Sequence, residues 1–313
     1  MEDKPLISVV IATYNGAQYL AAQLDSIYNQ TYFKIEVIVC DDKSTDATVE
    51  ILQEYEKRHG LRYYVNATKQ GVVKNFESAI AYANGSYIAL ADQDDVWLPD
   101  KLELSLQLLQ KIEKEAVKNQ PVVVFTDLTV VDAKLNIMHM SYWGFMKLNP
   151  KNTQLNRVLV ENVLTGCTLL MNRTTVNLAV PMPAEALMHD VWLLLVASCF
   201  GSVGYLREPT VLYRQHSQNV VGAQKKNILK KIASGYTKLK QNRFSLLLPE
   251  IEQAKSFYNR YSDQLLGYSE NKAILEAFIS LKNQSVFKKK YVIWKHAFYG
   301  STYKKALNIL LRA

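Results

Sequence analysis

The sequence predicts an α/β fold built on a mostly parallel β-sheet. In the first 120 residues, short apolar runs rich in β-branched side chains alternate with segments of helical pattern. Three of the runs end in polar clusters, at Thr13-Tyr14-Asn15, at Asp41-Asp42 and at Asp92-Gln93-Asp94-Asp95. Such alternation is typical of a parallel sheet covered by helices, and these sheets bind ligands beyond the carboxyl ends of their strands. We therefore expect the three clusters to share one edge.

The elements of the first half follow from local patterns. Residues 6–12 form a nearly continuous apolar run, which indicates a strand buried on both faces. A helix is expected over 17–28, a second strand over 35–40, and a helix over 47–59 that Ser44-Thr45-Asp46 caps. The alternation continues with a strand over 61–66, a helix over 74–83, a strand that ends at Asp92 and a helix over 99–117.

The regular alternation ends after residue 117. We expect a strand over 121–126, a polar stretch over 132–150 and a glycine-containing apolar segment over 163–171. A helix near Val191 and a strand over 204–213 follow, and from about Val220 the composition is helical and basic. The sequence thus predicts one domain over residues 1–220 and a helical basic region over 221–313.

Composition limits the class of protein. A chain of 313 residues with 49% hydrophobic residues and a mean hydropathy of −0.10 can bury one large core. Its cysteines, Cys40, Cys167 and Cys199, are odd in number and lie in apolar runs, so we expect neither a disulfide framework nor a zinc site. We expect no secretory signal, and the longest uncharged stretch, 191–206, is shorter than the roughly 20 residues of a membrane span.

Charge is distributed unevenly along the chain. Residues 1–220 carry 19 Lys and Arg against 24 Asp and Glu, whereas residues 221–313 carry 18 against 5. A basic tail of this kind binds nucleic acid or an anionic membrane face, or is a solvated helix surface.

The acidic run at 92–95 predicts a cation site. Carboxylates this close raise one another's pKa unless a cation lies among them, and a hard divalent ion takes oxygen ligands. The alternative interpretation is a solvated acidic loop, but the expected position of this run at the same sheet edge as the other two clusters favours a binding site. No glycine pattern of a dinucleotide-binding or P-loop protein is present. A cation that bridges carboxylates and a diphosphate would suit transfer from a nucleoside-diphosphate donor.

These motifs resemble a known family. Residues 9–15, residues 39–46 and the D-x-D of Asp92-Gln93-Asp94 are similar to those of inverting family 2 glycosyltransferases of the GT-A fold. The resemblance covers about residues 5–220. It implies a nucleotide-binding half over about 5–120 and an acceptor half over about 121–220. Residues 92–97, 189–192 and 213–222 also resemble the bacterial rhamnosyltransferase branch.

The resemblance implies roles for individual residues. Those expected to bind the donor nucleotide are Thr13, Tyr14, Asn15, Asp41, Asp42, Lys74, Asp92 and Gln93. A carboxylate at a strand end can accept from a pyrimidine N3–H, which favours uracil or thymine. Lys43 stands where the family has glycine, and lysine resists a positive φ, so the geometry of this turn is in question.

Metal and acceptor residues are implied in the same way. Asp94 would be the direct ligand of Mn²⁺ or Mg²⁺, with His216 as a second ligand or phosphate contact; His216 can equally stabilise its loop. Asp190 would be the general base that takes the proton from the acceptor hydroxyl, although it can also cap the helix near Val191. The expected acceptor or sugar contacts are Asp95, Trp97, Thr165, Gly166, His189, Trp192 and Arg214. The tryptophans can instead belong to the core, and Arg214 and Lys74 can be phosphate contacts or surface cations.

The basic tail interleaves lysines with aliphatic and aromatic residues at 225–232 and 286–295. This pattern suits an interfacial helix on anionic lipid; the alternatives are a helical region packed on the domain or used to form a homodimer. Nothing in it resembles a nucleic-acid module. We expect a cytoplasmic protein, peripheral at the inner face of the cell membrane.

Together these features predict a metal-dependent inverting glycosyltransferase. The expected donor is dTDP-rhamnose, and the expected acceptor is a lipid-diphosphate-linked saccharide of a bacterial surface polysaccharide. A UDP-hexose or UDP-N-acetylhexosamine is the alternative donor. Two other classes remain: a nucleotidyltransferase that makes sugar nucleotides, and an inactive nucleotide-sugar binding module.

Overall fold

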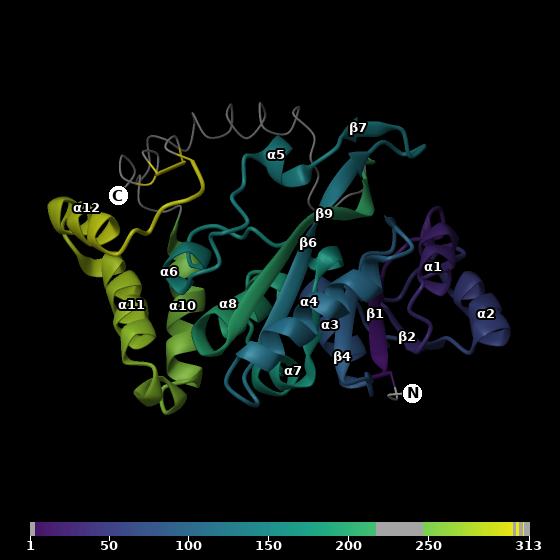
Figure 1. The fold of residues 1–313 in the computed structure, drawn as a ribbon, viewed down its shortest axis with the longest axis horizontal. Helices are drawn as coiled ribbons and strands as arrows, with labels where there is room; N and C mark the ends of the chain where they lie inside the picture. Colours follow the sequence, from purple (N-terminus) through teal and green to yellow (C-terminus); the bar gives the residue numbers. More distant parts are fainter. Residues whose placement is uncertain (1–3, 217–246, 303–304, 307–308, 310–313) are drawn as a thin grey trace. The chain divides into compact units, whose positions relative to one another are not determined.

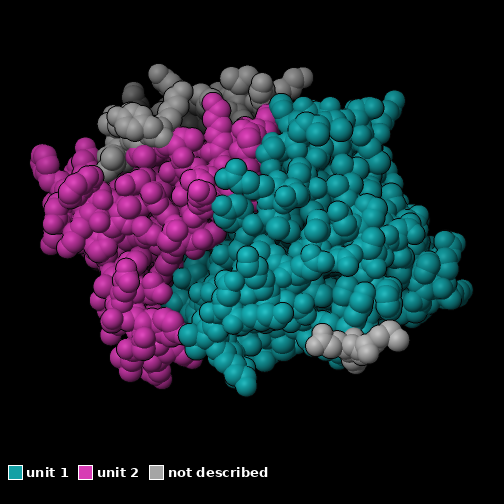
Figure 2. Space-filling view, in the orientation of Figure 1, with its two compact units in different colours: residues 1–142, 164–182, 188–214 teal, residues 143–163, 183–187, 215–313 magenta. Residues whose placement is uncertain are grey.

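The computed structural model describes residues 4–216, 247–302, 305–306 and 309. The chain divides into two compact units, shown in Figure 2. Unit 1 comprises residues 1–142, 164–182 and 188–214, and unit 2 comprises residues 143–163, 183–187 and 215–313. The predicted boundary at residue 220 and the basic segment at 225–232 lie outside the described residues.

Parallel strands form the first part of the sheet in unit 1 (Figure 1). The strands run in the order β3-β2-β1-β4, and all three pairings are parallel, as predicted. Their bounds are Ile7–Thr13 for β1, Ile35–Asp41 for β2, Arg62–Val65 for β3 and Tyr87–Ala91 for β4. All but one residue of β1 are buried, which explains its nearly unbroken apolar sequence.

The helices of this half lie close to their predicted positions. Their bounds are Leu20–Tyr28 for α1, Thr48–His59 for α2, Val72–Ala81 for α3 and Lys101–Glu115 for α4. At the start of α2, the Asp46 carboxylate accepts the backbone N–H of Thr48 at 3.1 Å, in agreement with the predicted cap. The helix ends at Gly60, whose φ of +72° is the left-handed conformation that glycine adopts without strain.

The second part of the sheet is mixed rather than parallel. β8 (Leu170–Asn172) lies antiparallel between β4 and β6 (Val122–Val131), and β6 pairs in parallel with β9 (Ser202–Arg214). Two short strands, β5 (Val96–Trp97) and β7 (Ile137–His139), add antiparallel edges. The helices α7 (Arg173–Ala179) and α8 (His189–Phe200) complete the unit. The mostly parallel arrangement therefore holds only for the first half.

Unit 2 is helical where the structure describes it. Its C-terminal helices are α10 (Leu248–Arg260), α11 (Ser269–Ser280) and α12 (Val286–Lys295), preceded along the chain by the short helices α5 (Tyr142–Met146) and α6 (Leu155–Val158). Phe257, Phe278 and Phe298 are fully buried, and the last two meet edge to face with 5.0 Å between ring centroids. No helix in the described part of the chain is both long and apolar enough to cross a bilayer.

Candidate active site

The three polar clusters meet at the carboxyl ends of β1, β2 and β4. Thr13 Oγ1 donates to Asp41 Oδ2 at 2.9 Å across the first two strands. The Gln93 amide pairs with the backbone of Tyr14 in both directions, since it accepts from Tyr14 N at 2.9 Å and donates to Tyr14 O at 3.2 Å. Clusters almost eighty residues apart thus form one rim.

Asp41 and Asp42 are both buried in this rim and hold its loops. Asp41 accepts the backbone N–H of Ser44 at 2.7 Å, which closes the turn after β2. Lys43, inside this turn, has φ of +66°, so lysine adopts the conformation for which the family uses glycine. Asp42 accepts from the backbone N–H groups of Gln70 at 2.7 Å and Gly71 at 2.9 Å. The loop before α3 is thereby fixed beside the rim.

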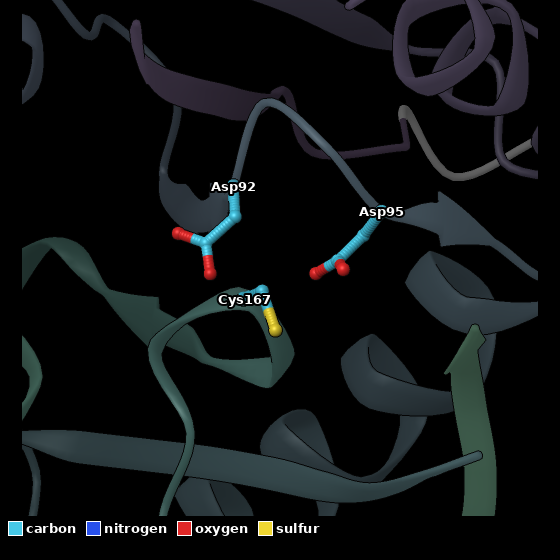
Figure 3. Close-up of side chains that lie close together, drawn as sticks. All are labelled: Asp92, Asp95 and Cys167. Atoms are coloured by element: carbon cyan, nitrogen blue, oxygen red, sulfur yellow. The ribbon is translucent and has the colours of Figure 1, made fainter. Parts of the chain in front are cut away.

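The acidic loop after β4 concentrates negative charge. Figure 3 shows the side chains of Asp92, Asp95 and Cys167 directed toward one another, and their possible ligand atoms all lie within 4.8 Å of each other. The pKa of Asp92 is raised to about 7, chiefly by burial and then by the carboxylates of Asp94 and Asp190. The pKa of Asp95 is raised well above its usual range by burial, Asp94 and Asp92. Each carboxylate therefore makes the ionised form of its neighbours less favourable.

Arg214 and Asp95 anchor this loop to the end of β9. Asp95 is fully buried; its Oδ1 accepts the backbone N–H of Arg214 at 3.0 Å, whereas its Oδ2 has no nitrogen or oxygen donor among the described residues. The Arg214 guanidinium donates to the carbonyl oxygens of Asp94 at 2.7 Å and Ala133 at 2.8 Å and lies over the Tyr19 ring. Arg214 is 4% exposed, so in this structure it positions the loop.

Asp190 and the segment around Gly166 lie beside the acidic loop. Asp190 is in the first turn of α8 rather than at its cap, which is Met188, and its Oδ1 accepts the backbone N–H of Val191 at 2.8 Å. A Cβ added to Gly166 would lie 2.9 Å from His189 Nε2 and 3.5 Å from the Asp190 Cβ. Glycine therefore lets this backbone pack closely against the start of α8, and its expected role on the acceptor side stays a prediction.

Three residues that were expected to contact the acceptor or the sugar are buried rather than exposed at the site. Trp97 and Trp192 are buried, with the Trp192 indole N–H donating to Ala179 O at 3.0 Å, so neither ring faces solvent. His189 is also buried and stacks on Phe76 with 3.9 Å between centroids; burial lowers its pKa and keeps the imidazole neutral.

The structure also places Lys74 and Thr165, and it assigns His216 to the other compact unit. Lys74 donates to Glu77 and to the Met182 carbonyl. Thr165, beside Gly166, is half-buried and accepts from the backbone of Thr168 at 2.9 Å. His216 belongs to unit 2, so its role as a metal ligand stays a prediction from sequence.

Three residues of this region were not assigned from the sequence. Cys167 contributes the third atom of the cluster in Figure 3, but burial raises its thiol pKa well above the usual range, so it is a weak ligand for a hard cation. Asn75 on α3 donates to the carbonyl oxygens of Thr13 and Cys40 and ties the first two strand ends together. Lys101 on α4 is fully buried 4.1 Å above the Trp97 ring. A polar residue on an apolar helix face is the only sequence signal for the last two.

Comparison with known proteins agrees with this geometry. Residues 8–176, more than half of the chain, match the family described as Glycosyl transferase family 2. The chain belongs to glycosyl transferase family 2. The matched region contains the rim, the acidic loop and Gly166, and it ends before Asp190 and His216.

Two curated relatives and one solved structure illustrate the similarity. The putative teichuronic acid biosynthesis glycosyltransferase TuaG of Bacillus subtilis is 28% identical over 257 residues, which are 77% of this chain and 91% of TuaG. The UDP-Glc:alpha-D-GlcNAc-diphosphoundecaprenol beta-1,3-glucosyltransferase WfgD of Escherichia coli is 28% identical over 177 residues, 56% of this chain and 63% of WfgD. In two other curated relatives the matched region spans 49% and 60% of the relative's own length.

The fold is that of S. aureus TarS. The structure of TarS residues 1–349 in complex with UDP-GlcNAc superposes with a TM-score of 0.55 at 15% identity, covering 98% of this chain and 90% of that one. The predicted GT-A fold is therefore confirmed. The rhamnosyltransferase branch stays a prediction, because these similarities do not distinguish it from other branches.

Proposed function

We propose that this family 2 glycosyltransferase transfers a sugar from a nucleoside-diphosphate donor to a saccharide hydroxyl, with inversion at the anomeric carbon. The observation that carries the proposal is a group of four carboxylates, at the rim where the three polar clusters meet. These carboxylates are Asp92, Asp94, Asp95 and Asp190. A diphosphate approaches such a group only with a cation between them.

A divalent cation fits the acidic loop. The carboxylates of Asp92 and Asp95 lie close together, and a cation between them would offset the repulsion that, together with burial, raises both pKa values. The donors are carboxylate oxygens, which suit Mg²⁺ or Mn²⁺. Asp94 is the proposed direct ligand of the ion and His216 the proposed second ligand, while Asp92 would contact the ribose or a metal-bound water. When bound, the ion neutralises charge on the departing diphosphate.

Asp190 is the proposed general base. Inversion requires a carboxylate on the acceptor side of the anomeric carbon, within hydrogen-bond reach of the attacking hydroxyl. Gly166 lies against His189 and Asp190, and a Cβ at this position would lie 3.5 Å from the Asp190 Cβ, so the glycine lets its backbone approach the proposed base closely. On α8, the Asp190 Oδ1 accepts the backbone N–H of Val191 at 2.8 Å, which favours one orientation of the carboxylate.

The proposed donor base is uracil or thymine. Tyr14 is 40% exposed on the rim and Lys69 Nζ lies 3.4 Å from its ring centroid, so an exposed aromatic ring with a cation over one face lies near Asp42. The complex of TarS with UDP-GlcNAc and the UDP-Glc donor in the name of WfgD favour a UDP-sugar. The dTDP-rhamnose predicted from sequence motifs is the competing donor.

The proposed acceptor is a lipid-diphosphate-linked saccharide of a cell-surface polysaccharide. WfgD is named for a diphosphoundecaprenol acceptor and TuaG for teichuronic acid biosynthesis. Such acceptors lie at the membrane, so we propose that the enzyme works at the inner membrane face and contacts it through residues 221–313. A homodimer formed by the same region is the alternative use.

A panel of nucleotide sugars tests the proposal. The purified chain is incubated with UDP-, dTDP- and GDP-sugars, each with and without Mn²⁺ or Mg²⁺, while thermal unfolding and nucleotide release are measured. We expect one UDP- or dTDP-sugar to raise the melting temperature only when the metal is present, and its nucleotide to be released on addition of acceptor. Stabilisation without any turnover would indicate the inactive binding module, and pyrophosphate release from a nucleoside triphosphate would indicate the nucleotidyltransferase. No stabilisation by any donor would refute the proposal.

A further inference from the structure

In unit 2, helix α12 (Figure 1) carries exposed aromatic side chains. Phe287 is 88% exposed, Trp294 68% and Tyr291 56%, although the same helix buries Val292 and Ile293 on its other side. Single exposed apolar side chains are common on protein surfaces, whereas a contiguous exposed apolar patch marks an interaction site. The three exposed side chains follow one another at spacings of four and three residues, so they belong to one face.

Lysines border this aromatic face on both sides. At about 100° per residue, Phe287, Tyr291 and Trp294 fall within about 60° of one another around the helix axis. On the same projection, Lys288 and Lys295 lie on one side of the aromatic face and Lys290 lies on the other. All three lysines are exposed. The helix therefore presents an aromatic centre with basic margins.

The surrounding sequence adds no negative charge. The helix itself contains no acidic residue, and Glu276 is the last Asp or Glu of the chain, whereas eight Lys or Arg follow it. Of these, Lys282 and Lys305 are engaged by Glu252 and Glu161. The three lysines that border the aromatic face have no ion pair among the described residues.

We propose that this face of α12, formed by Phe287, Tyr291 and Trp294 with Lys288, Lys290 and Lys295, docks on an anionic lipid bilayer. Aromatic rings occupy the boundary between headgroups and acyl chains, while lysines at the margins of a helix reach anionic headgroups. Protein interfaces are depleted in lysine, so a second copy of the chain fits the same face less well.

The benefit of this docking rests on the proposed function, whereas the docking itself can be measured independently of that function. An acceptor anchored in the bilayer is confined to the surface, and an enzyme held there meets it at a higher effective concentration. Lipid binding itself needs neither donor nor acceptor. Failure of vesicle binding and failure of glycosyl transfer are therefore distinguishable.

Vesicle flotation of the full chain tests the docking face. The probes are vesicles of phosphatidylcholine alone and of phosphatidylcholine mixed with phosphatidylglycerol, at low and high salt. We expect binding to the anionic vesicles only, weakened by salt because exposed charges are screened. The double variant Phe287→Ser/Trp294→Ser should lower the partition at least tenfold. Each of Lys288→Gln, Lys290→Gln and Lys295→Gln should lower it about fivefold.

Matched controls come from unit 1. Phe33 is 75% exposed and Lys57 is exposed on α2, so Phe33→Ser and Lys57→Gln remove the same chemistry elsewhere and should leave flotation unchanged. All changed positions are exposed, so thermal unfolding should be unaffected, which separates lost binding from misfolding. Equal flotation of the double variant and the wild type would overturn the proposal, as would equal binding to neutral and anionic vesicles. A wild-type dimer in sedimentation velocity that the double variant dissociates, without vesicle binding, would assign the face to a second copy instead.

Discussion

At Lys101 a positive charge is buried without a hydrogen-bond partner among the described residues. Burial lowers its pKa from the usual 10.5 to about 8, and the Trp97 ring below it supplies only a cation–π contact. A lowered pKa of this size corresponds to about 3 kcal/mol against the charged form. The residue therefore stabilises the fold less than an apolar side chain of similar length would.

Replacement of Lys101 by methionine should stabilise the protein at neutral pH. The unfolded chain holds this proton up to about pH 10.5 and the folded protein only up to about pH 8, so wild-type stability rises with pH between these values. Lys101→Met removes the penalty but also the cation–π contact, so we expect a gain of roughly 1–3 kcal/mol below pH 8 that shrinks toward pH 10.5. Urea unfolding at several pH values measures it, with Lys57→Met as the exposed control. If Lys101→Met is less stable than the wild type at pH 7, the interactions of the Lys101 ammonium stabilise the fold by more than its burial destabilises it.

Sequence alone identified the rim residues but not what surrounds them. Thr13, Asp41 and Gln93 were identified because each lies at the end of an apolar strand run. The alternation of strands and helices along the chain predicts parallel strands, whose carboxyl ends lie at one edge of the sheet. Asp127 could not be assigned, because its carboxylate is satisfied by the Ser141 hydroxyl and the backbone N–H of Tyr142, fourteen and fifteen residues away. Partners at such separations depend on tertiary folding, which no local pattern encodes.

Among the elements, hydrogen bonds of one side chain help to link the β1–α1 loop to the acidic loop. The Gln93 amide joins the two loops through the Tyr14 backbone. Gly16 makes room for it, because a Cβ there would lie 2.3 Å from Gln93 Oε1. Net stabilisation by two such hydrogen bonds is roughly 1–3 kcal/mol, less where solvent competes.

Gly16→Ala should displace the Gln93 amide and separate the two loops. We expect a loss of about 1–2 kcal/mol in the free energy of unfolding. A double-mutant cycle with Gln93→Ala checks the cause, since the added methyl should cost little once the amide is absent. If Gly16→Ala lowers the free energy of unfolding equally in the wild type and in Gln93→Ala, the added methyl does not act on the Gln93 amide. In that case the glycine does not preserve the link between the loops.

Element prediction succeeded where strands are long and apolar. β1, β2 and β4 lie within a residue of their predicted positions because buried parallel strands have unbroken apolar sequences. β5 and β8 have two and three residues, too few to show a period, so the antiparallel pairings in the second part of the sheet were not foreseen. β6 continues beyond its predicted end at residue 126 to Val131 because the polar side chains within it are buried with partners.

At the scale of the whole molecule, the chain's segments interleave. Residues 143–163 and 183–187 belong to the same compact unit as the C-terminal helices, although both precede residue 220. The Arg157 guanidinium donates to the Tyr299 carbonyl at 2.7 Å within that unit. A boundary drawn along the sequence, by composition, does not detect such contacts. Truncation of residues 221–313 would remove part of a shared core, so point variants are the better tests of the C-terminal region.

We propose that the acidic loop binds the donor and the metal and that Asp190 accepts the proton. Isothermal titration of the stabilising nucleotide sugar, with and without Mn²⁺, into the wild type, Asp94→Asn and Asp190→Asn tests this division most directly, with Glu56→Gln on α2 as the exposed control. We predict that Asp94→Asn loses metal-dependent binding. Asp190→Asn should bind the donor as the wild type does while its turnover falls by roughly 10²–10⁴-fold. Equal loss of donor binding in both variants, or metal-dependent binding retained in Asp94→Asn, would contradict the account.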